Sequence, residues 1–405
     1  MRSRVRALVI SLVAALAVLP AGAASAISTP TLQAKLTREM GHAGGFSGAF
    51  VRDLDSQQTL FASKPDAPRA PASVEKLYTT ASALMRFGPD ATLSTSVAGR
   101  GFLDPDGVWR GDLYLRGGGD PTLGRDDLQR LAGAVGEAGI LRVDGSVLGD
   151  ESRFDTLRGS FDTGGAYDRD IGGVLGALTL NRGFSKDGKP AAAAALQFAK
   201  ALRADGIRVE GRSGAGSAPA EARELASVAS PPMRDLIRLT NVPSDNFLAE
   251  TLVKDLGASF GGAGTTVAGV GVVKAQLQGF GVTPRVFDGS GLSRADRTTP
   301  RQVVHLLEAM HGQEVAGAFE GSLAVAGRTG TIRKRMRGTA AQDRCRAKTG
   351  TLIGVSALAG LCESAGGDTI AFAMLMNRVS VARAHGVQDR VATAIARYDG
   401  AASVR

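Results

Sequence analysis

The chain has 405 residues, a hydrophobic fraction of 43%, an aromatic fraction of 5% and a formal net charge of +9 at pH 7. Few aromatic residues and no recognition-helix pattern argue against a nucleic-acid-binding protein. Four histidines without metal-ligand spacing, and two cysteines outside any Cys-x-x-Cys motif, argue against a zinc site, so we expect no metal and no cofactor. The length exceeds that of a usual single domain and predicts two domains or one domain with a large insertion.

The N-terminal segment, residues 1–26, has the pattern of a secretory signal peptide. Three arginines precede an uncharged run, residues 7–19, and the sequence Ala-Ser-Ala ends at Ala26, after which we expect cleavage. The run is short for a bilayer span, and no later stretch offers about 20 uncharged apolar residues. We therefore expect an exported protein, periplasmic or extracellular, with no membrane span after cleavage.

Two elements are predicted after the signal peptide. Residues 47–62 predict a hairpin, because two β-prone runs flank an Asp-Ser turn. A core helix is expected to begin at Ser73 and to end at Gly88, which precedes a proline. Its apolar residues recur at helical spacing, and they are Val74, Leu77, Tyr78, Ala81, Leu84 and Met85.

Composition changes near residue 91, where short strand-like pieces separated by Gly, Pro and Asp begin. Helix-like runs at residues 127–138 and 191–204 interrupt these pieces. We therefore predict that residues 91–225 form an inserted, mostly β domain on which the second of these helices packs.

The remainder of the chain returns to helical periodicity near Pro231. A β pair is expected within residues 345–362 and a terminal helix within residues 387–398. We predict an α/β (α+β) fold in which residues 27–90 and 226–405 form one domain around the insertion.

Ser73 and Lys76 form a Ser-x-x-Lys pair at the start of the predicted helix. Free N–H groups and the helix dipole favour developing negative charge there. Lys76, one turn on, can reach the serine hydroxyl. Loss of hydration against the core would lower the pKa of the lysine and let it act as a base. The alternative is a capping serine beside an exposed lysine, since about one such pair is expected by chance in a chain of this size.

Two further motifs favour a catalytic interpretation. Ser-Asp-Asn at residues 244–246 opens a helical run, and Lys-Thr-Gly at residues 348–350 lies on a predicted strand. With the first pair they supply a second hydroxyl to relay protons, an amide to hold a substrate backbone and a cation to seat a carboxylate. Gly350 has no side chain, which would let a substrate lie along the strand edge.

Other motif-like segments are interpreted structurally. Residues 257–261 fit Gly-x-Ser-x-Gly, but the preceding sequence is helical, so we expect Gly257 to be a helix C-cap. Residues 327–331, GRTGT, mimic Lys-Thr-Gly without a β-prone flank, and we expect a loop. The basic segment 328–346 is expected to be either a solvated loop or a surface that meets an anionic partner.

With its three motifs in this order, the sequence resembles the D-alanyl-D-alanine carboxypeptidase/endopeptidase family, the low-molecular-mass class C penicillin-binding proteins. The segments that carry the resemblance are ASVEKLYTTASAL, LYLRGGGDPTL, SPPMRDLIRLTNVPSDNFLAETLVK, DGSGLSRADRTTP and AKTGTLIGVSALAG, and together with their order they cover most of the mature chain. The resemblance implies a penicillin-binding transpeptidase-like (β-lactamase-like) domain with an inserted domain.

The resemblance also implies an activity: an exported serine peptidase that cleaves the bond after D-alanine in peptidoglycan stem peptides, as a carboxypeptidase or an endopeptidase. It makes Ser73 the acylated nucleophile, Lys76 its proton acceptor and Ser244 the relay to the leaving D-alanine. The implied partners are peptidoglycan stem peptides, with β-lactam antibiotics as covalent inhibitors.

The implied substrate ligands lie in the second and third motifs. Asn246 would hold the substrate amide, Lys348 and Thr349 would meet the terminal carboxylate, and the N–H of Thr351 would complete an oxyanion hole with that of Ser73. Residues 288–293, DGSGLS, are expected either to shape the cleft or to form an ordinary Gly-rich turn.

Two rival functions are weighed against the peptidase. A class A β-lactamase would need a glutamate in Glu-x-x-Leu-Asn, but Ala177 stands at that position before Leu180 and Asn181. A catalytically silent wall-binding protein would have no need of all three motifs.

Cys345 and Cys362 flank the predicted β pair, and a turn at residues 352–355 would place them opposite each other. Export would permit oxidation, and directly opposed positions are close enough for a bridge when no bulge shifts the register. We expect a disulfide, with two free thiols as the alternative.

Overall fold

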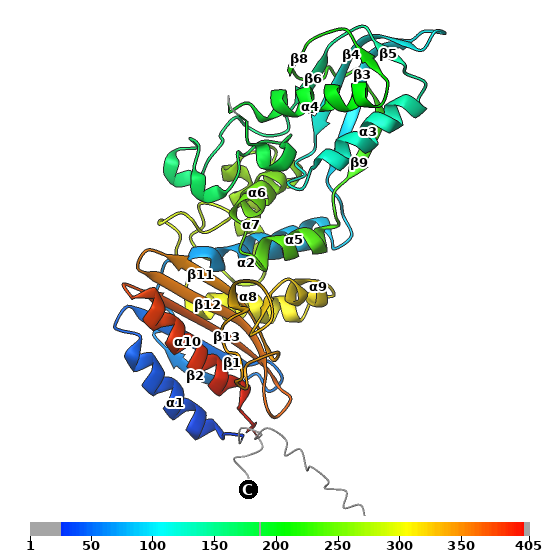
Figure 1. The fold of residues 1–405 in the computed structure, drawn as a ribbon. Helices are drawn as coiled ribbons and strands as arrows, with labels where there is room; N and C mark the ends of the chain where they lie inside the picture. Colours follow the sequence, from blue (N-terminus) through cyan, green and yellow to red (C-terminus); the bar gives the residue numbers. More distant parts are fainter. Residues whose placement is uncertain (1–25, 186–187, 401–405) are drawn as a thin grey trace, which may run out of the picture.

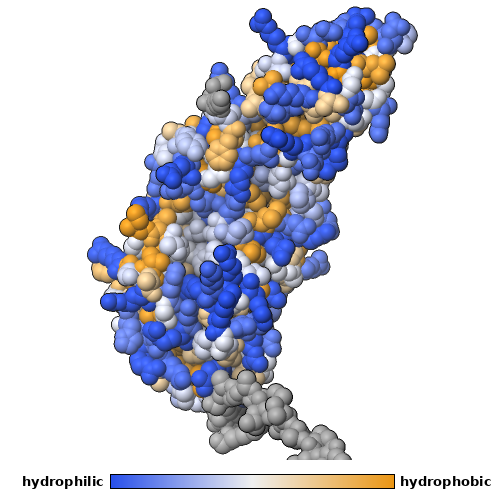
Figure 2. Space-filling view, viewed as in Figure 1, coloured by the Kyte–Doolittle hydropathy of each residue, from blue (hydrophilic) through white to orange (hydrophobic). Residues whose placement is uncertain are grey.

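The computed structural model describes residues 26–185 and 188–400, and its strands form two β-sheets (Figure 1). The predicted signal peptide lies outside the described residues except for Ala26. Within the described part, no helix is long and apolar enough to cross a bilayer. Figure 2 shows hydrophilic side chains over much of the visible face, interspersed with smaller hydrophobic groups.

The first sheet joins strands from both ends of the chain. Its six strands run in the order β10-β11-β12-β13-β1-β2, and all neighbours are antiparallel. The predicted hairpin is β1 with β2, and the predicted β pair is β11 with β12. The strands are β1 (Ser47–Asp53), β2 (Thr59–Ser63), β10 (Ala324–Val325), β11 (Cys345–Leu352), β12 (Val355–Glu363) and β13 (Thr369–Asn377).

Helices cover both faces of this sheet, which is why the central strands are apolar on both sides. Helices α1 (Thr29–His42) and α10 (Val381–Ala396) share one core with it. On the other face α8 (Pro300–His311) packs on the strands, and the core continues into the remaining helices. These are α2 (Lys76–Phe87), α5 (Met233–Asn241), α6 (Asn246–Phe260), α7 (Thr266–Gly279) and α9 (Ala316–Gly321).

The second sheet is built from the middle of the chain and has its own core with α3 (Arg125–Glu137) and α4 (Pro190–Ala204). The two helix-like runs predicted here correspond to these helices. Its strands are β3 (Ser94–Leu103), β4 (Val108–Gly117), β5 (Arg142–Val143), β6 (Val147–Asp150), β7 (Arg208–Val209), β8 (Ser213–Ala215) and β9 (Arg223–Ala229). Because β9 crosses the expected boundary at residue 225, the sheet ends slightly later than the predicted insertion; the division into domains stays a proposal.

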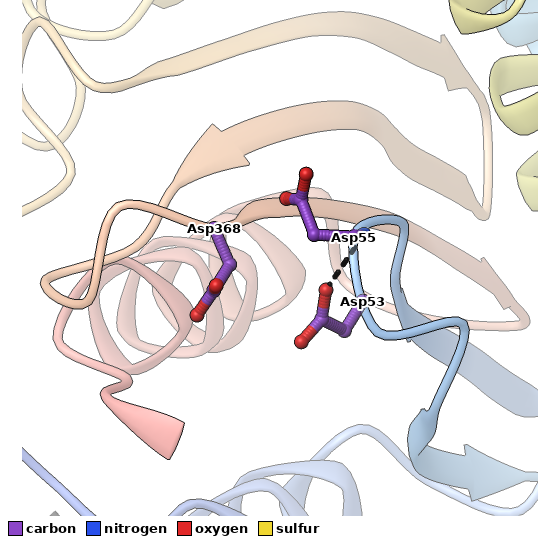
Figure 3. A group of neighbouring side chains, drawn as sticks. All are labelled: Asp53, Asp55 and Asp368. Carbon is purple, nitrogen blue, oxygen red and sulfur yellow. Dashed lines mark hydrogen bonds between the residues drawn. The ribbon is translucent and has the colours of Figure 1, made fainter. Parts of the chain in front are cut away.

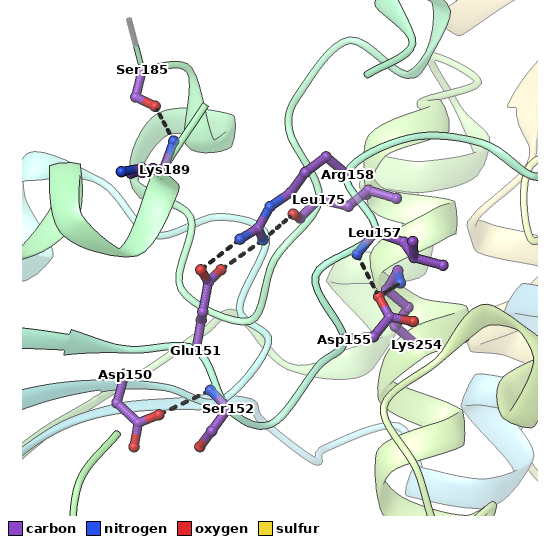
Figure 4. A network of polar contacts seen from close by, with 10 residues as sticks. All are labelled: Asp150, Glu151, Ser152, Asp155, Leu157, Arg158, Leu175, Ser185, Lys189 and Lys254. Carbon is purple, nitrogen blue, oxygen red and sulfur yellow. Dashed lines mark hydrogen bonds and ion pairs between the residues drawn. The ribbon is translucent and has the colours of Figure 1, made fainter. Parts of the chain in front are cut away.

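Residues 151–183 leave the second sheet and run along α6. Lys254 of α6 is almost completely buried, and its Nζ lies 2.6 Å from Asp155 Oδ1 (Figure 4). Arg158 fixes the segment internally through a bidentate contact with Glu151 and a bond to the carbonyl of Leu175 (Figure 4). The predicted insertion therefore reaches the helices of the first core as well as its own sheet.

The sequence before the Gly-x-Ser-x-Gly segment is helical, as expected, but the expectation that Gly257 is the C-cap is wrong. Helix α6 continues to Phe260, and Gly261 is the C-cap. A Cβ at Gly257 would lie 2.6 Å from the carbonyl oxygen of Ala263 and 2.8 Å from the nitrogen of Gly269. The absent side chain at this position therefore serves the close packing of α6 on α7.

The two cysteines form a disulfide. The register of β11 and β12 places Cys345 opposite Cys362, and Leu352 pairs with Val355 around a two-residue turn. The expected turn and the expected bridge are both confirmed. Residues 328–344 of the basic segment 328–346 lie in the connection between β10 and β11, and the last two residues belong to β11. GRTGT lies in this connection, as expected, and its end overlaps the short 3₁₀ turn η5 (Gly330–Ile332).

Candidate active site

Ser73 lies in a tight turn just before the core helix. It belongs to η1 (Ala72–Glu75), a 3₁₀ turn, and α2 begins at Lys76, so the serine precedes the α-helix itself. Ala72 has a left-handed backbone with φ of 48°, which is strained for a residue with a side chain. A Cβ at Gly291 would come within 2.1 Å of the Ala72 carbonyl oxygen, so the 288–293 loop packs directly against the turn that presents Ser73.

Lys76 is fully buried, and its terminal nitrogen contacts three oxygens. Nζ lies 3.0 Å from Ser73 Oγ, 2.6 Å from Asn246 Oδ1 and 2.7 Å from the carbonyl oxygen of Ser290. Burial lowers the pKa of Lys76 to about 8, against the opposing effect of nearby carboxylates. The structure therefore joins the first two motifs around a lysine that is easily made neutral.

The second motif approaches from the start of α6. Ser244 has a left-handed backbone with φ of 65°. Asp245 caps the helix by accepting a hydrogen bond from the N–H of Leu248 at 3.0 Å, and it also pairs with Arg182 from the 151–183 segment. The motif is thus fixed both by its own helix and by the predicted insertion.

The amide of Asn246 is engaged at both ends. Its Oδ1 accepts from Lys76, and its Nδ2 donates to the carbonyl oxygen of Asp170 at 2.7 Å. The amide therefore orients the lysine, a role that the sequence analysis does not predict. Its predicted contact with a substrate amide stays a prediction.

The third motif places a second buried lysine beside the second serine. Lys348 Nζ lies 2.7 Å from Ser244 Oγ and 2.9 Å from the carbonyl oxygen of Thr349. Burial, and then the charge of Lys76, hold the pKa of Lys348 well below its usual value. Thr349 and Thr351 follow on β11, and Thr351 is exposed. The seven predicted residues therefore lie at the junction of η1 with α2, at the start of α6 and on β11.

Gly350 has a packing role that the sequence does not predict, and its expected role in letting a substrate lie along the strand edge stays a prediction. A Cβ there would lie 2.3 Å from the carbonyl oxygen of Pro71 and 3.1 Å from the nitrogen of Val74. The glycine therefore lets β11 approach the turn that carries Ser73, which sets the distance between the first and third motifs.

Three contacts at the site come from residues that are not among the seven predicted ones, although Ser290 lies in the 288–293 segment that is expected to shape the cleft. Ser290 and Asp170 contact the site through backbone carbonyl oxygens. Every residue type has a backbone carbonyl, so the residue types at these positions do not predict the contacts. Thr331 accepts a hydrogen bond from Thr349 at 2.8 Å between hydroxyl oxygens. Thr331 belongs to the GRTGT segment, and neither its expected loop structure nor its similarity to Lys-Thr-Gly predicts this contact. The 288–293 loop does line the site, which favours the first of its two expected roles.

Two other features lie apart from these residues. A cavity of about 780 Å³ lies between the second sheet and the α6–α7 connection, and none of the seven predicted residues lines it. Asp53, Asp55 and Asp368 bring three carboxylates together at the edge of the first sheet (Figure 3). Oδ1 of Asp53 accepts from the N–H groups of Asp55 and Ser56, which is the arrangement of a turn cap.

Comparison with known proteins identifies the family. Residues 31–172 and 176–398 match the D-Ala-D-Ala carboxypeptidase 3 (S13) family. The chain is 32% identical to a D-alanyl-D-alanine carboxypeptidase of Actinomadura sp. (strain R39), over 88% of this chain and 82% of that protein. It is 29% identical to carboxypeptidase DacB of Mycolicibacterium smegmatis, over 81% and 75% of the two chains. Penicillin-binding protein 4 of Haemophilus influenzae matches with a TM-score of 0.75 at 21% identity, over 88% and 97% of the chains, which confirms the predicted fold. The chain therefore belongs to the D-Ala-D-Ala carboxypeptidase 3 (S13) family.

Proposed function

We propose that this protein is a serine D-Ala-D-Ala carboxypeptidase that cleaves the bond after D-alanine in peptidoglycan stem peptides through an acyl-enzyme on Ser73. The observation that carries the proposal is the position of Lys76 Nζ, which lies 3.0 Å from Ser73 Oγ. The lysine is fully buried, whereas the serine is partly exposed. This is the geometry of a nucleophile with its general base. The same chemistry would also cut cross-links that end in D-alanine.

The hydrogen bonds around Lys76 give the proton transfer a direction. A neutral amine has two N–H groups and one lone pair. Asn246 Oδ1 and the Ser290 carbonyl oxygen can only accept, so they take both N–H groups. The lone pair then faces Ser73 Oγ, whose proton it can accept as the serine attacks the substrate carbonyl.

The second serine and second lysine would serve the leaving group. Ser244 lies within hydrogen-bond distance of Lys348, so a proton passed to the departing D-alanine amine through Ser244 Oγ could be replaced from the lysine. We propose that Lys348 and Thr349 also attract the terminal carboxylate of the substrate. The N–H groups of Ser73 and Thr351 would stabilise the oxyanion.

We further propose that β-lactams acylate Ser73 and that the protein acts in the cell envelope after export. Penicillin-binding protein 4 of Haemophilus influenzae has been solved in complex with a β-lactam. The predicted signal peptide and the wall substrate both agree with export.

The decisive experiment uses a fluorescent penicillin. Wild type should form a covalent adduct on Ser73, and Ser73→Ala should form none while it still unfolds cooperatively near the wild-type temperature. An adduct on Ser73→Ala would refute the assignment. Mass analysis of products from linear and cross-linked wall fragments would then separate carboxypeptidase from endopeptidase action.

A β-lactamase is the rival function, and penicillin turnover distinguishes it. At the position of the required glutamate stands Ala177, which is buried and whose carbonyl accepts from the N–H of Gly119. We expect one equivalent of penicillin to be opened quickly, followed by slow release, while D-alanine release from peptides continues. Steady penicillin turnover at roughly tens per second, a typical enzyme rate, with such peptides left intact, would favour the β-lactamase.

A further inference from the structure

Four buried carboxyl groups cluster near Lys76, and the mechanism above uses none of them. Glu75, Glu250, Asp288 and Asp296 are each at most 1% exposed. They come from η1, from α6 and from the segment before α8. Their hydrogen bonds differ, and the difference singles out Asp288.

Asp288 is connected to Lys76 through a single peptide group. Its Oδ1 accepts from the N–H of Gly291, and its Oδ2 accepts from the N–H of Ser293, both at 2.7 Å. The Gly291 N–H belongs to the same planar peptide group as the Ser290 carbonyl, which accepts from Lys76 Nζ at 2.7 Å. A carboxylate at one end of this group polarises it and strengthens the carbonyl at the other end as an acceptor.

Glu75 and Asp296 are better described as neutral acids. Both carboxyl oxygens of Glu75 are buried without a hydrogen-bond partner in the part of the chain that the structure describes. Asp296 accepts from the N–H of Phe287 and shares a side-chain hydrogen bond with Asp288, which requires one of these two acids to carry a proton. Burial raises the pKa of Glu75 well above its usual value, and burial together with Asp288 raises that of Asp296 to about 11. Lys274 of α7 acts on Glu75 in the opposite direction but less strongly than burial.

Glu250 holds a different part of the same loop. Its Oε1 accepts from the N–H groups of Gly289 and Ser290, at 3.1 and 2.9 Å, and burial raises its pKa to about 8. Burial also raises the pKa of Asp288, but its backbone N–H donors oppose that shift. Glu250 and Asp288 each accept two backbone N–H groups. Asp288 differs because the Gly291 N–H that it accepts belongs to the peptide group whose carbonyl accepts from Lys76.

We propose that Asp288 is a positioning residue for the general base: it orients the peptide group that holds Lys76, and its negative charge stabilises the cation formed when Lys76 takes the proton of Ser73. This inference rests on the proposed function, since it needs Lys76 to act as the base. No proton has to reach Asp288, because the Ser73 proton stays on Lys76 Nζ while Ser244 supplies the proton of the leaving group.

Asp288→Asn tests the role of the charge, because asparagine keeps the size and one acceptor oxygen. The measurement is the second-order rate constant for fluorescent penicillin acylation as a function of pH. Without the carboxylate, the pKa of Lys76 should fall, so the acid limb of the profile should move to lower pH by about one unit. The maximal rate should fall by roughly tenfold or more, because the weaker base accepts a proton less readily.

Asp296→Asn is the matched control. It replaces a neutral acid by a neutral amide in the same cluster, so the acid limb should stay where the wild type has it. A wild type without an adduct on Ser73 would refute the proposed function. A wild-type adduct together with an unmoved limb in Asp288→Asn would refute this inference alone, since a purely structural role lowers the rate without moving the limb.

If Asp288→Asn is not recovered folded, the wild type decides by NMR. The ¹⁵N shift of the Gly291 amide should then titrate with the same midpoint as the side-chain signal of Lys76, because one peptide group joins them. A Gly291 signal that does not change through the Lys76 titration would overturn the proposal.

Discussion

Gly350→Ala should misplace the nucleophile although it touches no reacting atom. The new Cβ would lie 2.3 Å from the Pro71 carbonyl oxygen, whereas non-bonded contacts are optimal near ~3.5 Å, so the turn that carries Ser73 must shift by about 1 Å. A displacement of this size can cost roughly 10²-fold in rate. Overpacking should also destabilise the protein by about 1–3 kcal/mol.

The assay compares acylation with stability in the same samples. Fluorescent penicillin gives the acylation rate constant, and urea denaturation gives the free energy of unfolding. Gly149→Ala is a matched control, since its Cβ would lie 2.1 Å from the carbonyl oxygen of Ala191, between β6 and α4 in the second sheet. It should lose similar stability and keep wild-type acylation.

Acylation of Gly350→Ala at the wild-type rate would refute this prediction. An equal loss of acylation in Gly149→Ala would also refute it, because the effect would then follow stability and not the position of Ser73.

Three further outcomes follow from the site. The rate of acylation by penicillin should fall about tenfold per pH unit below about pH 8, because burial lowers the pKa of Lys76 to about 8 and only the neutral lysine accepts the serine proton. A rate that stays flat from pH 6 to about pH 9 would contradict this. Lys348→Ala should reduce the rate of D-alanine release by roughly 10- to 100-fold, as expected for loss of a charge-assisted contact with the substrate carboxylate. Amidating that carboxylate should reduce the rate of the wild type much more than the rate of the variant. Replacing Cys345 and Cys362 by serine should lower the free energy of unfolding by about 3 kcal/mol, given their sequence separation of 17, while acylation at Ser73 persists. Urea denaturation measures this change, and an unchanged denaturation midpoint would contradict the prediction.

The parts of the fold that could be predicted are those with strong local patterns. The helix after Ser73 has apolar residues at helical spacing, and Val74, Leu77 and Leu84 are indeed fully buried. The turn between β11 and β12 follows from the symmetric placement of Cys345 and Cys362 about it. Such features depend on neighbours in sequence, so one sequence is enough to reveal them.

The rest depends on pairing between distant segments. Strand β1 lies beside β13, with Ser47 opposite Met376, and no local pattern indicates that the two ends of the chain meet. At the site, Asp170 and Ser290 contribute carbonyl oxygens, which leave no mark on residue type. The sequence predicts that position 350 needs a glycine, but it does not reveal the close approach of the Pro71 carbonyl, which joins segments far apart in the chain.

The burial of the acid cluster bears on the fate of the acyl-enzyme. In the proposed mechanism, a carboxylate that activates the water for hydrolysis of the Ser73 ester would have to lie beside Ser73 and be open to that water. Glu75, Glu250 and Asp288 lie near Lys76 but are completely or almost completely buried, and Asp245 is occupied by Arg182 and the α6 cap. None of these four acids is therefore placed to activate that water. In the proposed mechanism, hydrolysis then relies on the same lysine and serine groups that serve acylation, and a tethered β-lactam leaving group would stand in their way.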